Sequence, residues 1–200
     1  MSRTLPLSLA VIGRDTLLTK VLLVAGGSLL VALAAQVKVP MLPVPMTLQT
    51  LAISVIGLTY GSRMAAATLV AYLIEGAIGL PVFAGASFGI ATLVGPTGGF
   101  LFGFVAMAWM TGLMVERGFG KGLIKLFLAA LVPGMLLYIP GAAWPVLATK
   151  LAFGAGWGAD NLAMVWQYYV GPFLVGDVVK AALAALTVFG GWKMVSSRKA

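Results

Sequence analysis

The chain has 200 residues, of which 61% are hydrophobic and 9% are charged, and its mean hydropathy is +1.07. Soluble domains keep roughly a quarter of their residues charged, so this composition excludes a soluble globular domain and predicts an integral membrane protein. The chain contains no Cys and no His, which excludes zinc sites, thiol nucleophiles, disulfides and catalysis by His. We therefore expect a chain without catalytic residues, metals or cofactors.

Apolar blocks along the chain predict an all-α integral membrane protein with six transmembrane helices in a single domain, residues 1–200. A bilayer core takes about 20 helical residues, and the blocks lie at about 17–35, 48–60, 64–80, 98–115, 123–139 and 171–192. The first block lacks a convincing signal-peptidase cleavage pattern, so we expect a retained helix. The second block is short for a span. The fifth ends where Pro140 and Gly141 break the pattern.

Three connections have an unusual composition. Residues 36–47, QVKVPMLPVPMT, contain three prolines within six positions. Proline fixes φ and lacks an N–H, so we expect an irregular loop there. Residues 81–99 form a long Gly-rich connection. Residues 142–167 form a mixed stretch that is compatible with a short interfacial helix.

The distribution of Lys and Arg tests the helix count, because cytoplasmic loops are enriched in both residues. With six helices, the termini share one side with the second-to-third and fourth-to-fifth loops. That side carries Arg3, Arg14, Lys20, Arg63, Arg117, Lys121, Lys125, Lys193, Arg198 and Lys199. The opposite loops carry only Lys38 and Lys150. The pattern favours six spans with both termini cytoplasmic. The net charge of +8 is then explained by membrane topology and not by nucleic-acid binding.

Polar residues inside the predicted helices collect at their outer ends. Glu75 lies near the outer end of the third helix, Tyr138 ends the fifth, and Asp177 and Lys180 lie in the outer part of the sixth. An intramembrane charge costs about 3 kcal/mol on insertion scales and usually faces a cavity or a partner. We therefore expect a solute pocket that opens to the outside.

Each of these features also has a simpler explanation, which the sequence leaves open. Asp177 and Lys180, at i and i+3, can act as a self-neutralising ion pair. Glu75 can snorkel to the interface, and GPTGG at 95–99 can be a plain turn and helix start. The aromatic residues can form an interfacial belt; they are Phe83, Phe88, Tyr138, Trp144 and Trp166.

Four segments carry a resemblance to a known family. They are PVPMTLQTLA at 43–52, YLIEGAIGLPVFAG at 72–85, GPTGGFLFGF at 95–104 and PFLVGDVVK at 172–180. In this order they resemble the BioY family, the biotin-binding S components of energy-coupling factor (ECF) transporters. The resemblance covers nearly the whole chain. It implies a six-helix protein of the bacterial cytoplasmic membrane that binds biotin, takes part in biotin uptake and is not an enzyme.

The resemblance also implies a site. Biotin would lie near the outer ends of the third, fifth and sixth helices, under a lid formed by the loop between the first and second. Asp177 would accept from a ureido N–H, and Lys180 would donate to the ureido oxygen or to the carboxylate. The other expected contacts are Glu75 with a second ureido N–H, Thr47 and Gln49 through hydrogen bonds, Phe83 and Tyr138 as apolar walls, and Gly98 and Gly99 through close backbone approach.

The implied partners are a transmembrane coupling protein and two ATPase subunits. Docking in the family is described through a small-residue motif on the first helix. The nearest match here is Ser28 and Ala32, with Ala25 and Ala35 near the same face. One alternative function is an S component or small transporter for a different vitamin-like solute. Another is an intramembrane aspartyl protease, which needs a second facing carboxylate that the predicted helices do not supply as an Asp.

Overall fold

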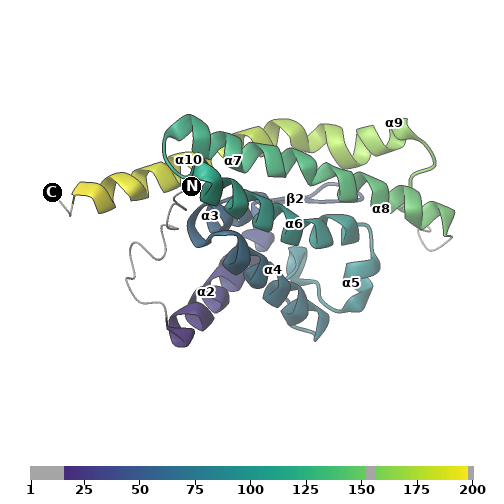
Figure 1. The fold of residues 1–200 in the computed structure, drawn as a ribbon. Coiled ribbons are helices and arrows are strands. Elements are labelled where there is room, and N and C mark those ends of the chain that lie inside the picture. Colours follow the sequence, from purple (N-terminus) through teal and green to yellow (C-terminus); the bar gives the residue numbers. More distant parts are fainter. Residues whose placement is uncertain (1–15, 152–155, 198–200) are drawn as a thin grey trace.

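The protein is described by a computed structural model that covers residues 16–151 and 156–197. It is almost entirely helical (Figure 1). The longer helices are α2 (Leu17–Gln36), α3 (Gln49–Tyr60), α4 (Ser62–Ala77), α6 (Gly98–Met114), α7 (Leu123–Leu136), α8 (Tyr138–Lys150) and α10 (Leu174–Ser197). The short elements are β1 (Lys38–Val39), β2 (Met46–Thr47), η1 (Ala84–Ala86), α5 (Ile90–Val94), η2 (Val115–Phe119), α9 (Leu162–Val165), η3 (Trp166–Val170) and η4 (Gly171–Phe173).

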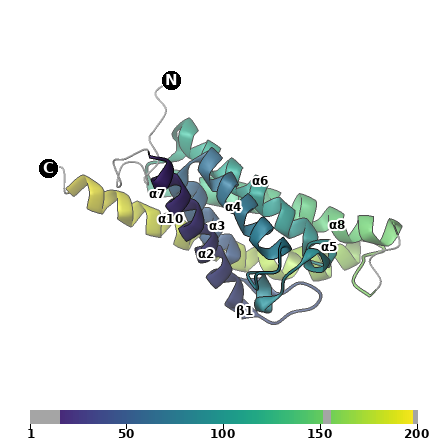
Figure 2. The same ribbon diagram turned by 90° about the horizontal axis from the view of Figure 1, so that it is seen from below.

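Helix α6 forms the centre of the bundle. It packs against α3, α4, α7 and α8, while α10 covers α3 and α7 on one side and α2 covers α3 and α4 on the other (Figures 1 and 2). Glycines bring the central helices close together. A Cβ on Gly112 would lie 2.3 Å from the backbone nitrogen of Ser62, and one on Gly57 would lie 2.6 Å from Cβ of Thr111. Such close approach is how helices gain packing energy in a lipid environment.

The junctions at the end of the bundle away from the β-hairpin are held by polar contacts. Glu116 accepts hydrogen bonds from the backbone nitrogen and the hydroxyl of Ser62, at 2.7 and 2.9 Å. Nζ of Lys121 lies 5.9 Å from the ring centre of Trp192. The α3–α4 turn, the α6–α7 connection and the C-terminal half of α10 therefore meet at one end. The β-hairpin and α5 lie at the opposite end (Figure 2).

The structure extends the fifth predicted helix beyond its expected end at Pro140. Helices α7 and α8 follow each other with only Leu137 between them, and together they form one apolar helical segment of 28 residues, Leu123–Lys150. Proline removes one N–H from the ladder but keeps φ near the helical value. Leu137 has helical φ and ψ of −57° and −31°, so Pro140 interrupts the hydrogen-bond pattern without turning the chain.

The sixth predicted helix is also longer than expected. The elements α9, η3, η4 and α10 make up one helical segment of 34 residues, Leu162–Val195, instead of a helix that begins near residue 171. Gly171 and Pro172 change the helix type locally, to the short η4 turn, but do not end it. Part of the mixed stretch 142–167 is therefore helical, at both of its ends.

Within the described residues, four helical segments are long and apolar enough to cross a membrane: Leu17–Gln36, Gly98–Phe119, Leu123–Lys150 and Leu162–Val195. Helix α3 is apolar but has 12 residues, and α4 has 16. Both are shorter than the roughly 20 residues that span a bilayer core. The chain is thus a multi-pass membrane protein. Arg3, Arg14, Arg198 and Lys199, which entered the charge argument, lie outside the described residues.

The proline-rich connection is more regular than expected. Strands β1 and β2 pair antiparallel, with Lys38 opposite Thr47 and Val39 opposite Met46. The backbone nitrogen of Leu48 continues the ladder by donating to the carbonyl of Val37, at 3.1 Å. The three prolines all lie between the two strands or at their edge, where they have no ladder hydrogen bond to lose. The segment is thus a short β-hairpin whose connecting residues 40–45, which hold all three prolines, form the expected irregular loop.

Candidate functional site

A cavity of about 420 Å³ opens at the hairpin end of the bundle. Its volume is within the range of roughly 300–1,000 Å³ that is typical of small-molecule sites. Helices α3, α6 and α10, the α7–α8 junction, the hairpin and the connection between α4 and α6 supply its walls. The lining side chains are mostly apolar, with a few polar groups; the apolar ones include Val44, Phe83, Ala84, Phe100, Leu101, Phe104, Leu137 and Phe173.

The polar groups of the cavity are concentrated around Asp177, in the first turn of α10. Nζ of Lys180 lies 2.8 Å from Oδ1 of Asp177, and Thr50 donates to the same oxygen at 2.9 Å. Tyr138 donates its hydroxyl proton to Oδ2 of Asp177, and Nζ of Lys180 also donates to Oγ1 of Thr50 at 3.2 Å. The side chains come from three helices, α3, α8 and α10, and they meet because all three helices have an end at this cavity.

Because this cluster is buried, its two charges need compensating contacts. Asp177 and Lys180 are each only 8% exposed, and the penalty for removing two charges from water is several kcal/mol per ion unless further hydrogen bonds compensate it. Thr50 and Tyr138 supply those bonds. The ion pair expected as a simple explanation is present, yet both partners also line the cavity. A carboxylate and an ammonium that face one cavity can bind a neutral ligand group with both N–H donors and a carbonyl acceptor.

A second chain of hydrogen bonds fixes the wall next to the hairpin. Thr47 donates to Oε1 of Gln49 at 2.9 Å, and Nε2 of Gln49 donates to the hydroxyl of Tyr72 at 2.9 Å. Tyr72 in turn donates to the carbonyl of Val82 at 3.1 Å. Gln49 is 4% exposed, so its amide is held in one orientation at the start of α3. Thr47 and Gln49 both line the cavity.

The amide of Gln36, at the end of α2, positions the wall formed by residues 83–87. Its Nε2 donates to the carbonyl of Phe83 at 3.1 Å, and its Oε1 accepts from the backbone nitrogen of Ala86 at 2.9 Å. Between these contacts the chain turns through left-handed residues, Gly85 with φ of +69° and Ala86 with φ of +57°. One side chain thereby holds a strained turn against the cavity.

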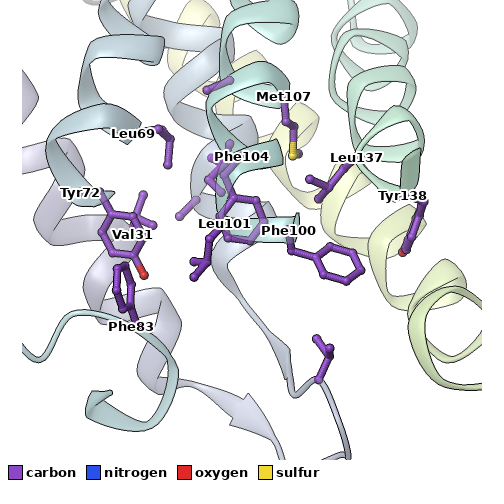
Figure 3. Close-up of a cluster of buried hydrophobic side chains, with 14 of the residues drawn as sticks. Val31, Leu69, Tyr72, Phe83, Phe100, Leu101, Phe104, Met107, Leu137 and Tyr138 are labelled. Carbon is purple, nitrogen blue, oxygen red and sulfur yellow. The ribbon is translucent and has the colours of Figure 1, made fainter. Parts of the chain in front are cut away.

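Aromatic side chains form the apolar walls (Figure 3). Phe83 is 1% exposed and meets Tyr72 edge-on, with ring centres 5.4 Å apart. On the other side Phe100 points toward Tyr138, with ring centres 6.2 Å apart and nearly perpendicular planes. Edge-to-face pairs of this kind add about 1 kcal/mol beyond the area they bury. The walls are therefore rigid rather than adaptable.

Six of the nine predicted binding residues line this cavity: Thr47, Gln49, Phe83, Tyr138, Asp177 and Lys180. The other three do not. Glu75 accepts a hydrogen bond from the hydroxyl of Ser28 at 2.8 Å and so joins α4 to α2. A Cβ on Gly98 would lie 2.2 Å from the Leu93 carbonyl oxygen and 2.9 Å from the Trp144 ring, and one on Gly99 would lie 2.4 Å from the Pro140 carbonyl oxygen. These two glycines serve the packing of α6 against α8, and Thr97 and Phe100 line the cavity in their place.

The residues of the predicted docking face on the first helix are mostly buried within the chain. Ser28, Ala32 and Ala35 are buried against the rest of the chain, because small residues let α2 approach α3 and α4. Of the predicted set only Ala25 is exposed. The exposed face of α2 includes Leu22, Gly26, Leu29 and Leu33.

Sequence reasoning missed several lining residues. Thr50 bonds both charged side chains, and its signal was present: two polar residues, Gln49 and Thr50, open an otherwise apolar helix. Phe100 and Phe104, four residues apart on one face of α6, and Phe173, just before α10, had no comparable signal. Aromatic residues at helical spacing are equally typical of a packed core.

Comparisons with known proteins agree on one family. A sequence model described as the BioY family matches residues 5–197. The probable biotin transporter BioY of Pyrococcus horikoshii is 36% identical over 157 residues, which cover 78% of this chain and 86% of that protein. The biotin transporter BioY of Rhizobium etli is 34% identical over 197 residues, which cover 92% of this chain and 98% of that protein.

One solved structure has the same fold. It is the crystal structure of the S-component for biotin from an ECF-type ABC transporter, and it matches with a TM-score of 0.68. The match covers 88% of this chain and 92% of that chain at 22% sequence identity. The helical arrangement described above is therefore that of an ECF S-component.

Proposed function

Because this chain belongs to the BioY family, we propose that it binds biotin in the cavity at the hairpin end and takes part in biotin uptake across a membrane. The observation that carries the proposal is the buried cluster of Asp177, Lys180, Thr50 and Tyr138 at one wall of a mostly apolar cavity. Relatives named as biotin transporters supply the identity of the solute.

The chemistry of biotin matches this cavity. Its bicyclic head carries two ureido N–H donors, one carbonyl acceptor and an apolar thiophane ring. A carboxylate such as Asp177 accepts from an N–H, while the ammonium of Lys180 donates to a carbonyl. In a water-poor cavity both interactions are stronger than in solution. The thiophane ring and the methylene tail suit the aromatic walls formed by Phe83, Phe100 and Phe173.

The proposed topology has six spans in one membrane domain, with both termini cytoplasmic and α3 and α4 as the short spans. Its support is the separation of charge from the cavity. The end of the bundle opposite the hairpin carries Arg63, Arg117, Lys121, Lys125 and Lys193, and the contacts of Ser62 with Glu116 and of Lys121 with Trp192 hold those segments together. Basic residues favour the cytoplasmic side, which supports a cavity that opens to the outside of a bacterial cytoplasmic membrane.

Within this proposal the hairpin acts as the lid, because Val44, Pro45 and Thr47 lie over the cavity as part of its lining. Energy for uptake would come from a separate ECF module, consisting of a transmembrane coupling protein and two ATPase subunits. The candidate contact with that module is the exposed apolar face of α2, where Gly26 has open space beside it. The buried small residues of α2 face the rest of the chain and are not part of this contact.

Uptake of radiolabelled biotin by bacterial cells that lack their own biotin transport tests the function. Cells that produce this chain together with a coupling module should accumulate biotin, and cells that produce the Asp177→Asn variant should not. The same cells with labelled thiamine or riboflavin serve as controls for the solute. Accumulation of another vitamin in place of biotin would contradict the proposal.

A further inference from the structure

One cation outside the buried cluster, Lys38 on β1, has its ammonium group next to Gly85 in the wall formed by residues 83–87. We infer that the ammonium of Lys38 receives the carboxylate tail of biotin at the mouth of the cavity, while the ureido head lies against Asp177 and Lys180. This inference rests on the proposed function and goes beyond it, because it assigns the two polar ends of the ligand to different residues.

Strand register places the Lys38 side chain on the cavity side. Lys38 lies directly opposite Thr47 in the hairpin, and directly opposed residues of an antiparallel pair project to the same face. The side chain of Thr47 lines the cavity, and it bonds Gln49 in the cavity wall. Lys38 therefore projects from the hairpin to the same face as Thr47, just outside the residues that line the cavity.

The ammonium group lies over the opposite rim. A Cβ on Gly85 would lie 2.4 Å from Nζ of Lys38, so the ammonium occupies the space that any other side chain at residue 85 would fill. Gly85 lies in the turn positioned by Gln36, and its neighbour Ala84 lines the cavity, as does Ser87. Lys38 thus bridges the two rims of the mouth, from the lid to the wall at 83–87.

The charges favour Lys38 over Lys180 as the partner of an anionic tail. Lys180 is already neutralised by Asp177 at 2.8 Å, and a second carboxylate there would face the charge of Asp177 in a buried site, which is costly. The structure gives Lys38 no carboxylate within ion-pair distance among the residues that it describes. Lys38 is also exposed, so its charge is already hydrated and binding requires little desolvation.

The remaining carboxylates that the structure describes are occupied or distant. Glu75 accepts from Ser28 between α2 and α4, and Glu116 accepts from Ser62 at the far end of the bundle. Asp160 precedes α9, outside the cavity lining. The mouth of the cavity therefore has a net positive charge next to a neutral interior, an arrangement that favours a ligand with a neutral polar head and an anionic tail.

The test compares biotin with its carboxamide, which has nearly the same shape but no charge. Dissociation constants for both ligands are measured by calorimetry on the purified full chain, its Lys38→Gln variant and a control variant, Lys150→Gln. Lys150 is the other predicted outer-loop cation, and it lines a different hollow, between α6, α8 and α9. We expect the unaltered protein and Lys150→Gln to bind biotin about tenfold more tightly than its carboxamide. A ratio of this size is expected for one charge-assisted hydrogen bond at a partly exposed site.

For Lys38→Gln we expect the preference to fall to about one, with the affinity for the carboxamide unchanged. In the unaltered protein, the ratio of the two dissociation constants should also fall toward one as the salt concentration is raised, because salt screens exposed charges. A preference that survives in Lys38→Gln overturns the inference, and so does an equal loss of affinity for both ligands, which would mean damage to the hairpin. If the unaltered protein binds neither ligand, the biotin proposal itself fails, and the inference fails with it.

Discussion

At the scale of single residues, the decisive feature is a buried ion pair that is not needed for packing. An apolar pair of similar size at positions 177 and 180 would be no less stable, so stability alone does not explain why α10 carries two charges at 8% exposure each. The hydrogen bonds from Thr50 and Tyr138 hold the carboxylate of Asp177 in one orientation. We therefore interpret the cluster as part of a binding site for a polar ligand.

Asp177→Asn should weaken biotin binding roughly 100-fold, because charge-assisted hydrogen bonds are each worth about 1.5–3 kcal/mol. Calorimetry on the purified variant measures the loss, and circular dichroism checks that the helices remain. Glu75→Gln is the matched control. The same carboxylate-to-amide change there affects only the contact with Ser28, so the affinity should stay within about twofold. Equal losses in the two variants would contradict the assignment.

The charged site residues could be predicted from the sequence because a charge inside a membrane helix is rare and needs a reason. Glu75 is predicted on the same ground, but it lies outside the cavity lining. One hydroxyl, that of Ser28 on another helix, satisfies its carboxylate away from the cavity. Such a pairing between α2 and α4 depends on tertiary structure, and the residue pattern within either helix does not predict it.

At the scale of elements, glycines decide how closely α6 and α8 approach. Gly99→Ala should lower the thermal unfolding temperature in detergent, because the new Cβ would lie 2.4 Å from the Pro140 carbonyl oxygen. Overpacking of this kind costs about 1–3 kcal/mol. Gly134→Ala is the control, since its nearest neighbour is Cε of Met107 at 3.8 Å. If Gly99→Ala lowered biotin affinity without lowering the unfolding temperature, the backbone at this position would touch the ligand after all.

The hairpin should control how fast the ligand leaves. Replacing Pro40 and Pro45 with Gly restores backbone freedom worth about 1–2 kcal/mol in total, so the open lid gains population. We expect the biotin off-rate to rise roughly five- to thirtyfold, as measured by displacement of labelled biotin. The same substitutions should leave the on-rate within about twofold. An unchanged off-rate would mean that the hairpin is only a connector.

Element types could be predicted more securely than element ends. Apolar blocks identified the main helices, but Pro140 and Gly171–Pro172 suggested ends that the structure does not have. Proline keeps the helical φ, and neighbouring helices hold the chain in line across the missing hydrogen bond. The proline-rich sequence of the hairpin did not predict the pairing of Lys38 with Thr47. Such short strands depend on packing against the cavity wall more than on local β propensity.

At the scale of the whole molecule, a group of basic residues lies at the end of the bundle opposite the cavity: Arg63, Arg117, Lys121, Lys125 and Lys193. The natural chain contains no Cys, so single cysteines can report which end faces which side. A membrane-impermeant thiol reagent should label Asp160→Cys in intact cells. It should label Lys121→Cys only after the membrane is permeabilised. The reverse pattern would contradict the proposed orientation.

The central claim is that the cavity binds biotin, and isothermal titration calorimetry on the purified chain in detergent tests it most directly. Biotin is titrated first, with thiamine and riboflavin as separate controls under the same conditions. We expect saturable one-site binding of biotin and no heat of binding from either control. Absence of biotin binding by a protein that keeps its helical content, or equal binding of all three vitamins, would contradict it.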